Sequence, residues 1–197
     1  MWNLKRSFET ESDEDLMREI ASGKRSAFNE LYSRYGERLF RYFCRMLWNE
    51  RETALDFTQN AFLKILEKPE QYNPSRSFKT WFFSIAWNMC KNEYRRRNIR
   101  QTESFGEHGP ELPAETEAME RSDMKKFVQD LHRNLDHLDE IQRQTFVLRY
   151  IEELSLSEIA AIMECPEGTV KSRLYYTLKK LAKPLAEYRP DKTKDYE

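Results

Sequence analysis

The chain has 197 residues, enough for one ordinary domain or two small ones, and 33 Lys and Arg against 34 Asp and Glu leave a formal net charge of -1. With 39% apolar and 13% aromatic residues, five glycines and seven prolines, the composition excludes collagen-like, low-complexity and disordered chains. There is no run of about 18 apolar residues, and residues 1–7 lack the apolar core of a signal peptide, so we expect no membrane insertion. Valine is absent before Val128, and because sheets favour β-branched residues, we predict an all-α protein.

Capping patterns and apolar spacing predict two helices in the first 48 residues. Ser12-Asp13-Glu14-Asp15 is a capping box that opens a short helix ending near Gly23. Ser26 is a second cap, after which apolar residues recur at three- and four-residue steps as far as Met46. A short helix and then a long one are therefore expected.

Two further helices are predicted between residues 49 and 101. Asn49 caps the third, which stops at Pro69, and residues 69–77 are a loop because they combine prolines, serines and an asparagine. The fourth helix starts at Phe78 and runs into the Arg95-Arg96-Arg97 cluster. A short break at 88–92 stays open, because asparagine competes for backbone hydrogen bonds.

The second half of the chain predicts a linker and another set of helices. Residues 102–121 hold glycines, prolines and few apolar side chains, which is typical of a flexible linker. Asp139 and Ser155 are caps for two later helices, and after a turn at 164–166 a last helix runs from Glu167 to about Lys183. We therefore predict two small helical domains, residues 1–101 and 122–197, joined by the linker 102–121.

The charges are arranged in blocks that the net charge hides. Residues 79–100 and 167–189 are basic, whereas residues 101–120 carry acids and no lysine or arginine. A basic block can be merely a solvated face. Two of them, each on a helix that also carries aromatic residues, favour a nucleic acid as the partner.

Residues 156–183 fit the helix-turn-helix plan, in which the second helix enters the DNA major groove. Ala160 lets the two helices approach, and Gly168 keeps the start of the second helix unobstructed. Side chains on its first turns can donate hydrogen bonds to phosphates or base edges: Thr169, Lys171, Ser172 and Arg173. An ordinary helical hairpin with a basic face is the structural alternative.

Three segments resemble a known family. Residues 158–174 (EIAAIMECPEGTVKSRL) closely resemble conserved region 4 of extracytoplasmic-function (ECF) sigma factors, the small promoter-specificity subunits of bacterial RNA polymerase. Residues 56–63 (DFTQNAFL) look like region 2.2, and residues 78–88 (FKTWFFSIAWN) with the following basic cluster look like regions 2.3 and 2.4. The resemblance implies an alternative sigma factor that binds core polymerase, recognises and opens a promoter, and starts transcription.

The resemblance also implies which residues act. Region 2.2 binds the β′ clamp helices of the polymerase, through the positions matched here by Asp56, Gln59, Asn60, Leu63 and Leu66, although either leucine could instead belong to the core. Asn88 matches the position that reads a flipped base of the −10 element. The strand and its phosphates would be followed by Lys91, Asn92, Tyr94, Arg95 and Arg96. The −35 element would be read by Thr169, Lys171, Ser172, Arg173 and Tyr176, with Arg143 and Arg149 as phosphate clamps.

Two positions depart from the family pattern in ways that a structure can test. Glu164 stands where the family often has glycine, and a left-handed backbone there would strain the turn. Asn60 stands where the family often has glutamate, which removes the charge from that contact.

The implied partners are core RNA polymerase (β′ clamp helices and β flap), promoter DNA and an anti-sigma factor, in the cytoplasm. The acidic linker would thread toward the RNA exit path, or serve only as a solubilising tether. A compact autoinhibited free form is a further hypothesis. Three widely spaced cysteines, Cys44, Cys90 and Cys165, exclude a disulfide framework and leave a redox-sensing thiol open.

Other classes of function make different demands on the sequence. A stand-alone helix-turn-helix regulator would not need the aromatic and basic segment at 78–100, and a decoy that only binds polymerase would not need the basic residues of the last helix. Glycine-rich phosphate loops, nucleophile elbows and metal-ligand spacings are absent from the sequence, so we expect no enzyme activity, catalytic residue, metal or cofactor.

Overall fold

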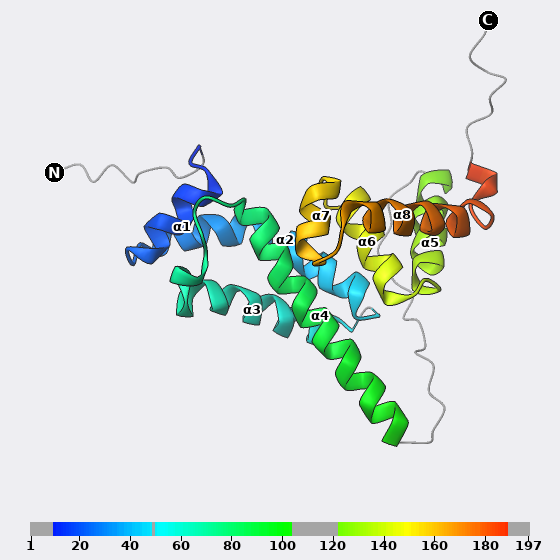
Figure 1. The fold of residues 1–197 in the computed structure, drawn as a ribbon, viewed down its shortest axis with the longest axis horizontal. Coiled ribbons are helices and arrows are strands. Elements are labelled where there is room, and N and C mark those ends of the chain that lie inside the picture. Colours follow the sequence, from blue (N-terminus) through cyan, green and yellow to red (C-terminus); the bar gives the residue numbers. More distant parts are fainter. Residues whose placement is uncertain (1–9, 49, 104–121, 189–197) are drawn as a thin grey trace, which may run out of the picture. The chain divides into compact units, whose positions relative to one another are not determined.

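The computed structural model describes residues 10–48, 50–103 and 122–188 (Figure 1), and all structural statements concern these residues. Their regular secondary structure is helical, without strands, which confirms the all-α prediction. The helices are α1 (Asp13–Ala21), α2 (Arg25–Met46), α3 (Arg51–Glu67), η1 (Pro69–Gln71), α4 (Phe78–Glu103), α5 (Ser122–Asp136), α6 (Glu140–Tyr150), α7 (Leu156–Ile162), α8 (Glu167–Ala182) and η2 (Ala186–Tyr188).

The chain divides into two compact units. Unit 1 comprises residues 1–112 with 161–164, and unit 2 comprises residues 113–160 with 165–197. Most of the predicted linker, residues 104–121, lies outside the described residues, so the predicted domain borders stay predictions.

Unit 1 has a core of stacked and edge-on aromatic rings between α2, α3 and α4. Phe82 lies at its centre and is fully buried. Its ring centroid is 5.0 Å from that of Phe62, 5.2 Å from Phe78 and 5.9 Å from Tyr35. Aromatic pairs at these spacings add to the free energy of burial, so this cluster sets where α4 lies in the unit.

Of the helix caps predicted in unit 1, one is confirmed and one is wrong. The Ser12 side chain caps α1 by accepting from the Asp15 backbone N–H, and Gly23 follows with a φ of 86°. The prediction that Ser26 caps α2 is wrong, because α2 begins at Arg25 with Lys24 in the cap position. Asn49 lies outside the described residues.

The break considered at 88–92 does not occur, because α4 runs without interruption from Phe78 to Glu103. Ala86, Cys90 and Tyr94 are buried at four-residue steps, so an apolar stripe passes straight through the asparagine-containing segment. Packing of this stripe outweighs the local preference of asparagine for other conformations.

Unit 2 contains the helices α5, α6 and α8, and its predicted caps are confirmed. Asp139 accepts from the Gln142 backbone N–H at 2.8 Å at the start of α6. Before α7, Glu158 accepts from the Ser155 backbone N–H at 2.8 Å, and Ser155 Oγ accepts from the Glu158 N–H at 3.2 Å. This reciprocal capping box fixes the entry of the chain into α7.

Candidate nucleic-acid interface

The turn between α7 and α8 has a left-handed backbone at the position where the family often has glycine. Glu164 adopts a φ of 51°, and the following Cys165 N–H donates to the Ala160 carbonyl at 3.1 Å. Left-handed geometry costs a side-chain-bearing residue free energy that glycine does not incur. The strain expected for glutamate at this position is therefore present.

The first turns of α8 present a mixed polar and aromatic face. Thr169, Ser172, Arg173 and Tyr176 follow one another at three- and four-residue steps and so share one side of the helix. Lys171, Ser172 and Tyr176 are exposed, whereas Arg173 is half-buried and its Nη1 donates to Cys165 Sγ at 3.6 Å. Four of the predicted −35 residues thus share one side of α8, and Lys171 lies on the neighbouring side.

The open start of α8 adds to this face. A Cβ atom placed on Gly168 would meet nothing within 4 Å, which agrees with the expected unobstructed helix start. The first N–H groups of a helix have no partner within the helix and can bind a phosphate, although the Thr169 N–H already donates to the Pro166 carbonyl at 2.9 Å.

The two arginines predicted as phosphate clamps of α6 have roles inside the unit. Arg143 is 2% exposed and forms an ion pair with Asp136 at 3.5 Å, which contradicts the prediction that it reaches a phosphate. Arg149 donates from Nη1 to the Leu154 carbonyl at 2.8 Å and braces the turn before α7. It stays partly exposed, so its phosphate contact stays a prediction.

The polar face of α4 lies on one continuous helix. Five residues of this face are exposed: Asn88, Lys91, Asn92, Arg95 and Arg96. They lie at three- and four-residue steps along the helix. Helical periodicity therefore brings all five to one side. We call these five residues the α4 face.

Tyr94 is the predicted −10 residue that the structure contradicts. It is 3% exposed, and its hydroxyl donates to the Met46 carbonyl at 2.7 Å. Its spacing of four from Cys90 and eight from Ala86 placed it on the buried stripe, a signal that the sequence already contained.

Glu93 and Arg97 are residues of the same helix that sequence reasoning did not single out. Glu93 is 6% exposed, and its carboxylate pairs with Arg96 Nη2 at 2.5 Å and with Arg97 Nε at 2.8 Å. Arg97 also pairs with Glu50, and its hydrogen bonds lower the pKa of the Glu50 carboxyl. The four-residue spacing of Glu93 and Arg97 could have shown the local pair, but nothing local points to Glu50.

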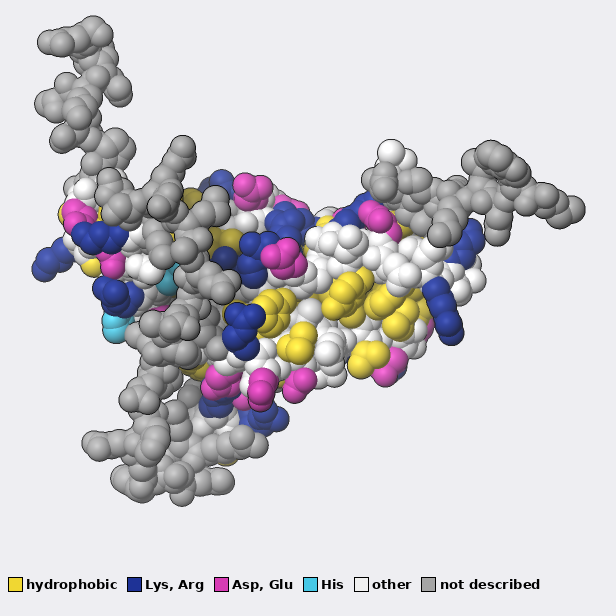
Figure 2. All heavy atoms as spheres, turned by 180° about the vertical axis from the view of Figure 1, so that it is seen from behind, with side chains coloured by type: hydrophobic (Ala, Val, Ile, Leu, Met, Phe, Trp, Pro, Cys, Tyr) yellow, Lys and Arg dark blue, Asp and Glu magenta, His cyan; other side chains and the backbone are white. Residues whose placement is uncertain are grey.

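The predicted polymerase-binding residues form the outer face of α3. Asp56, Gln59 and Asn60 are exposed, and the leucines of this face, Leu63 and Leu66, are 46% and 47% exposed. The alternative that these leucines belong to the core is therefore wrong. Figure 2 shows a view in which hydrophobic side chains gather between acidic and basic ones. An exposed apolar strip of this kind marks an interaction surface.

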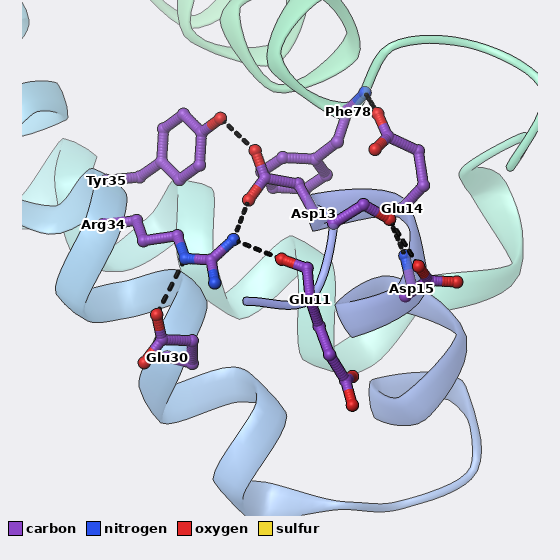
Figure 3. Close-up of polar contacts among 9 residues, drawn as sticks. Glu11, Asp13, Glu14, Asp15, Glu30, Arg34, Tyr35 and Phe78 are labelled. Carbon is purple, nitrogen blue, oxygen red and sulfur yellow. Dashed lines mark hydrogen bonds and ion pairs between the residues drawn. The ribbon is translucent and has the colours of Figure 1, made fainter. Parts of the chain in front are cut away.

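A network at the start of unit 1 holds α1, α2 and α4 together (Figure 3). Asp13 accepts from Arg34 Nη1 at 2.8 Å and from the Tyr35 hydroxyl. Glu14 accepts from the Phe78 backbone N–H at 2.9 Å, at the first residue of α4. A carboxylate is favourable at a helix N-terminus, so α1 helps to fix where α4 begins.

In the described ranges, no group of three or more His, Cys, Asp or Glu side chains is placed to hold a metal ion. None of the helices over the same residues is both long and apolar enough to cross a membrane.

Comparison with known proteins places these features in a family. Residues 31–99 match the family described as Sigma-70 region 2, and residues 129–181 match Sigma-70, region 4. The RNA polymerase sigma-H factor of Pseudomonas aeruginosa is 29% identical over 186 residues, which cover 89% of this chain and 94% of that protein. The ECF sigma factor SigW of Bacillus subtilis is 27% identical over 182 residues, covering 87% of this chain and 95% of that protein.

Solved structures show the same fold. The sigma factor RpoE of Bartonella quintana, solved with the anti-sigma factor NepR, aligns with a TM-score of 0.67 at 24% identity over 82% of this chain and 98% of that one. CnrH, solved with the cytosolic domain of CnrY, aligns with a TM-score of 0.66 at 23% identity over 90% of this chain and 99% of that one.

The two region matches, in this order, define the sigma-70 class. The chain belongs to the ECF group of this family, as its relatives over most of its length show. It is an alternative sigma factor, which directs the initiation of transcription.

Proposed function

We propose that this sigma factor opens the −10 promoter element with the α4 face, reads the −35 element with the first turns of α8, and binds core polymerase with the outer face of α3. The observation that carries the proposal is the α4 face, five exposed polar residues on one uninterrupted helix. A stand-alone helix-turn-helix regulator has no use for such a face on a second unit.

The chemistry of the α4 face suits an unpaired strand. The Asn88 amide offers both donors and an acceptor to the edge of a flipped base. Lys91, Arg95 and Arg96 supply positive charge for phosphates along the same side of the helix. A base that is held by the amide compensates for the stacking that is lost when the duplex opens.

The chemistry of α8 suits the major groove of a duplex. Arg173 can donate two hydrogen bonds to one guanine, Thr169 and Ser172 can contact either base edges or phosphates, and the Tyr176 ring can contact a thymine methyl. The hydrogen bond to Cys165 limits the directions that the Arg173 guanidinium can take.

The remaining partners follow from the relatives and from the α3 surface. The leucines of α3 offer an apolar centre and Asp56 a charged edge for the β′ clamp helices. The β flap is the expected polymerase partner of unit 2. The sigma factor RpoE, which has the same fold, was solved with the anti-sigma factor NepR, which supports such a partner here. We place the protein in the cytoplasm with the polymerase and assign it no catalytic activity of its own.

The test compares polymerase binding with promoter opening. We expect Asn88→Ala to leave binding of the labelled protein to core polymerase unchanged, measured by fluorescence anisotropy, and to reduce opening by the holoenzyme about 5- to 100-fold, the worth of one base contact. Opening is measured with a fluorescent base analogue in the −10 element. Asn29→Ala, which removes an exposed amide from α2, is the matched control.

Equal losses of core binding and opening for Asn88→Ala would overturn the base-reading role. Tight, sequence-dependent binding to duplex DNA by the protein alone, without binding to core polymerase, would identify a stand-alone regulator instead.

A further inference from the structure

The side chains just after Arg97 on α4 are exposed. Asn98 is exposed and Ile99 is 53% exposed, yet the helix continues to Glu103. In Figure 1 this end of α4 extends beyond α3 within unit 1. Helices in proteins owe most of their stability to tertiary packing, so the contacts just before Asn98 help to decide how well the second half of α4 is held.

Arg97 makes the contacts at that point. Its Nη1 and Nη2 donate to the two carboxylate oxygens of Glu50 at 2.9 Å and 2.6 Å, and its Nε donates to Glu93 at 2.8 Å. Glu50 is 47 residues earlier in the chain, in the cap position of α3. A two-pronged arginine–carboxylate pair is strong and fixes direction, so it ties α4 to the start of α3.

The turn between α2 and α3 completes the arrangement. The Arg97 guanidinium lies 4.9 Å from the centre of the Trp48 ring, and Trp48 packs edge-on against Tyr94 with centroids 5.4 Å apart. Tyr94 in turn donates to the Met46 carbonyl. Trp48 has a φ of 51°, a conformation that a bulky residue adopts only where surrounding contacts impose it. We call Arg97, Glu50, Glu93 and Trp48 the α4 latch.

The latch distinguishes Arg97 from Arg95 in the arginine cluster. Two carboxylates and an aromatic ring offset its charge and occupy its guanidinium. A phosphate contact would have to break the pair with Glu50 and weaken the partnership of the buried Glu93, which is costly. Arg95 is exposed and lies on the α4 face, so its charge is presented to solvent.

We propose that Arg97 is a positioning residue rather than a DNA contact: through Glu50, Glu93 and Trp48 it holds the second half of α4 on the α2–α3 turn, so that the α4 face meets promoter DNA as one rigid surface. The inference rests on the proposed role of the α4 face in promoter opening. It also means that the arginines of the 95–97 cluster do not act as equivalent phosphate contacts.

The first measurement is amide hydrogen exchange of the full chain. Arg97→Lys keeps the charge but loses the two-pronged geometry, and Glu50→Gln weakens the partner. We expect both variants to raise exchange of the amides of residues 94–103 about tenfold, because charge-assisted hydrogen bonds are lost. Arg95→Ala should leave this exchange unchanged. Unaltered exchange in both latch variants, with native far-UV circular dichroism, would overturn the proposal.

The second measurement is promoter opening by the holoenzyme as salt is varied. The proposal predicts that Glu50→Gln and Arg97→Lys reduce opening about tenfold at every salt concentration, with an unchanged log–log slope. Arg95→Ala should reduce the slope by roughly 0.7–0.9, the value of one lost phosphate contact. A slope that falls by the same amount for Arg97→Ala would make Arg97 a DNA contact and refute the positioning role.

Glu50→Gln separates the two explanations most clearly, because they predict changes in opposite directions. Removing a negative charge near DNA should strengthen binding if only net charge matters, whereas loss of the latch weakens opening. Glu37→Gln makes the same charge change at an exposed position of α2 and is the matched control. If the proposed function fails instead, Asn88→Ala and Arg95→Ala leave opening intact while the exchange results for the latch variants still hold.

Discussion

The two helices assigned to promoter DNA, α4 and α8, are held in place by different kinds of contact. Those that fix α4 join residues far apart in the chain: Glu50 to Arg97 across 47 positions, Met46 to Tyr94 across 48 and Glu14 to Phe78 across 64. The polar contacts at the start of α8 span three positions between Thr169 and Ser172 and eight between Cys165 and Arg173.

This difference has a consequence for how each surface responds to change. The polar contacts of the α8 face are local, so substitutions elsewhere in unit 2 should leave its shape intact as long as the buried side of α8, with Val170, Leu174 and Leu181, stays packed. The α4 face depends on the core of unit 1 and on charged ties at both ends of the helix. We therefore expect α4 to be the more sensitive of the two to substitutions that touch no DNA.

The largest effect is expected from the aromatic core under α4. Phe82→Ala leaves a cavity among Phe62, Phe78 and Tyr35 and should lower the free energy of unfolding of unit 1 by about 3–5 kcal/mol. Hydrogen exchange resolved by residue measures the loss in α1–α4, with α5 and α6 as the internal reference. A change below 1 kcal/mol would show that the cluster does not carry the packing of α4.

The next largest effect concerns the tie between α1 and α2. Asp13→Asn removes the charge that faces Arg34 and weakens the acceptor of Tyr35, which should cost about 1.5–3 kcal/mol in urea unfolding. Glu37→Gln, which disturbs only an exposed pair with Arg41, should cost less than about 0.5 kcal/mol. Equal effects of the two substitutions would mean that the partial burial of the Asp13–Arg34 pair contributes nothing to stability.

A smaller effect of opposite sign is expected in the turn before α8. Glu164→Gly relieves a left-handed glutamate and should raise the free energy of unfolding by about 0.5–1 kcal/mol, after the entropy that glycine adds to the unfolded chain. Glu153→Gly, at a φ of 56°, tests the same reasoning at a second left-handed residue. Urea midpoints measure both, and destabilisation by both substitutions would contradict the strain argument.

The smallest effect is a loss of stability that occurs only at alkaline pH. Burial raises the pKa of Tyr72 to about 12, and burial with the hydrogen bond to Asp13 raises the pKa of Tyr35 further, from ordinary values of 10.0. Because the folded protein favours the neutral phenols, this stability is complete below pH 10 and is lost as the pH rises through the raised values. The urea midpoint should therefore fall between pH 9 and pH 12, and by less in Tyr35→Phe; an equal fall would exclude Tyr35 as a source.

Local sequence signals predicted much of the fold and most residues of the α4 and α8 faces. The caps at Ser12, Asp139 and Ser155 are confirmed because each satisfies backbone groups within three residues of itself. The helix-turn-helix segment was recognisable for the same reason, since its turn and its polar face lie within consecutive residues. The exposed side of α4 also followed from helical spacing alone.

Other predictions failed where distant residues intervene. Tyr94 and Arg143 were assigned to DNA by residue type and family position, yet both are buried by partners elsewhere in their units. The cap of α2 lies at Lys24, two residues before the predicted Ser26, and the α4 break was suppressed by the packing of Ala86 and Cys90. Residue type indicates what a side chain can do, but burial decides whether it can reach a ligand.

The sequence by itself determined an all-α chain of the ECF group, its main helices and the composition of the α4 and α8 faces. These depend on hydrogen bonds and periodicities that operate over a few residues, so they can be inferred before the chain is folded. Only the tertiary structure decided that Leu63 and Leu66 are exposed, that Arg143 is buried, and that Arg97 is tied to Glu50. Each of these depends on which distant segments meet, and that is fixed by the packing of the apolar core rather than by any local pattern.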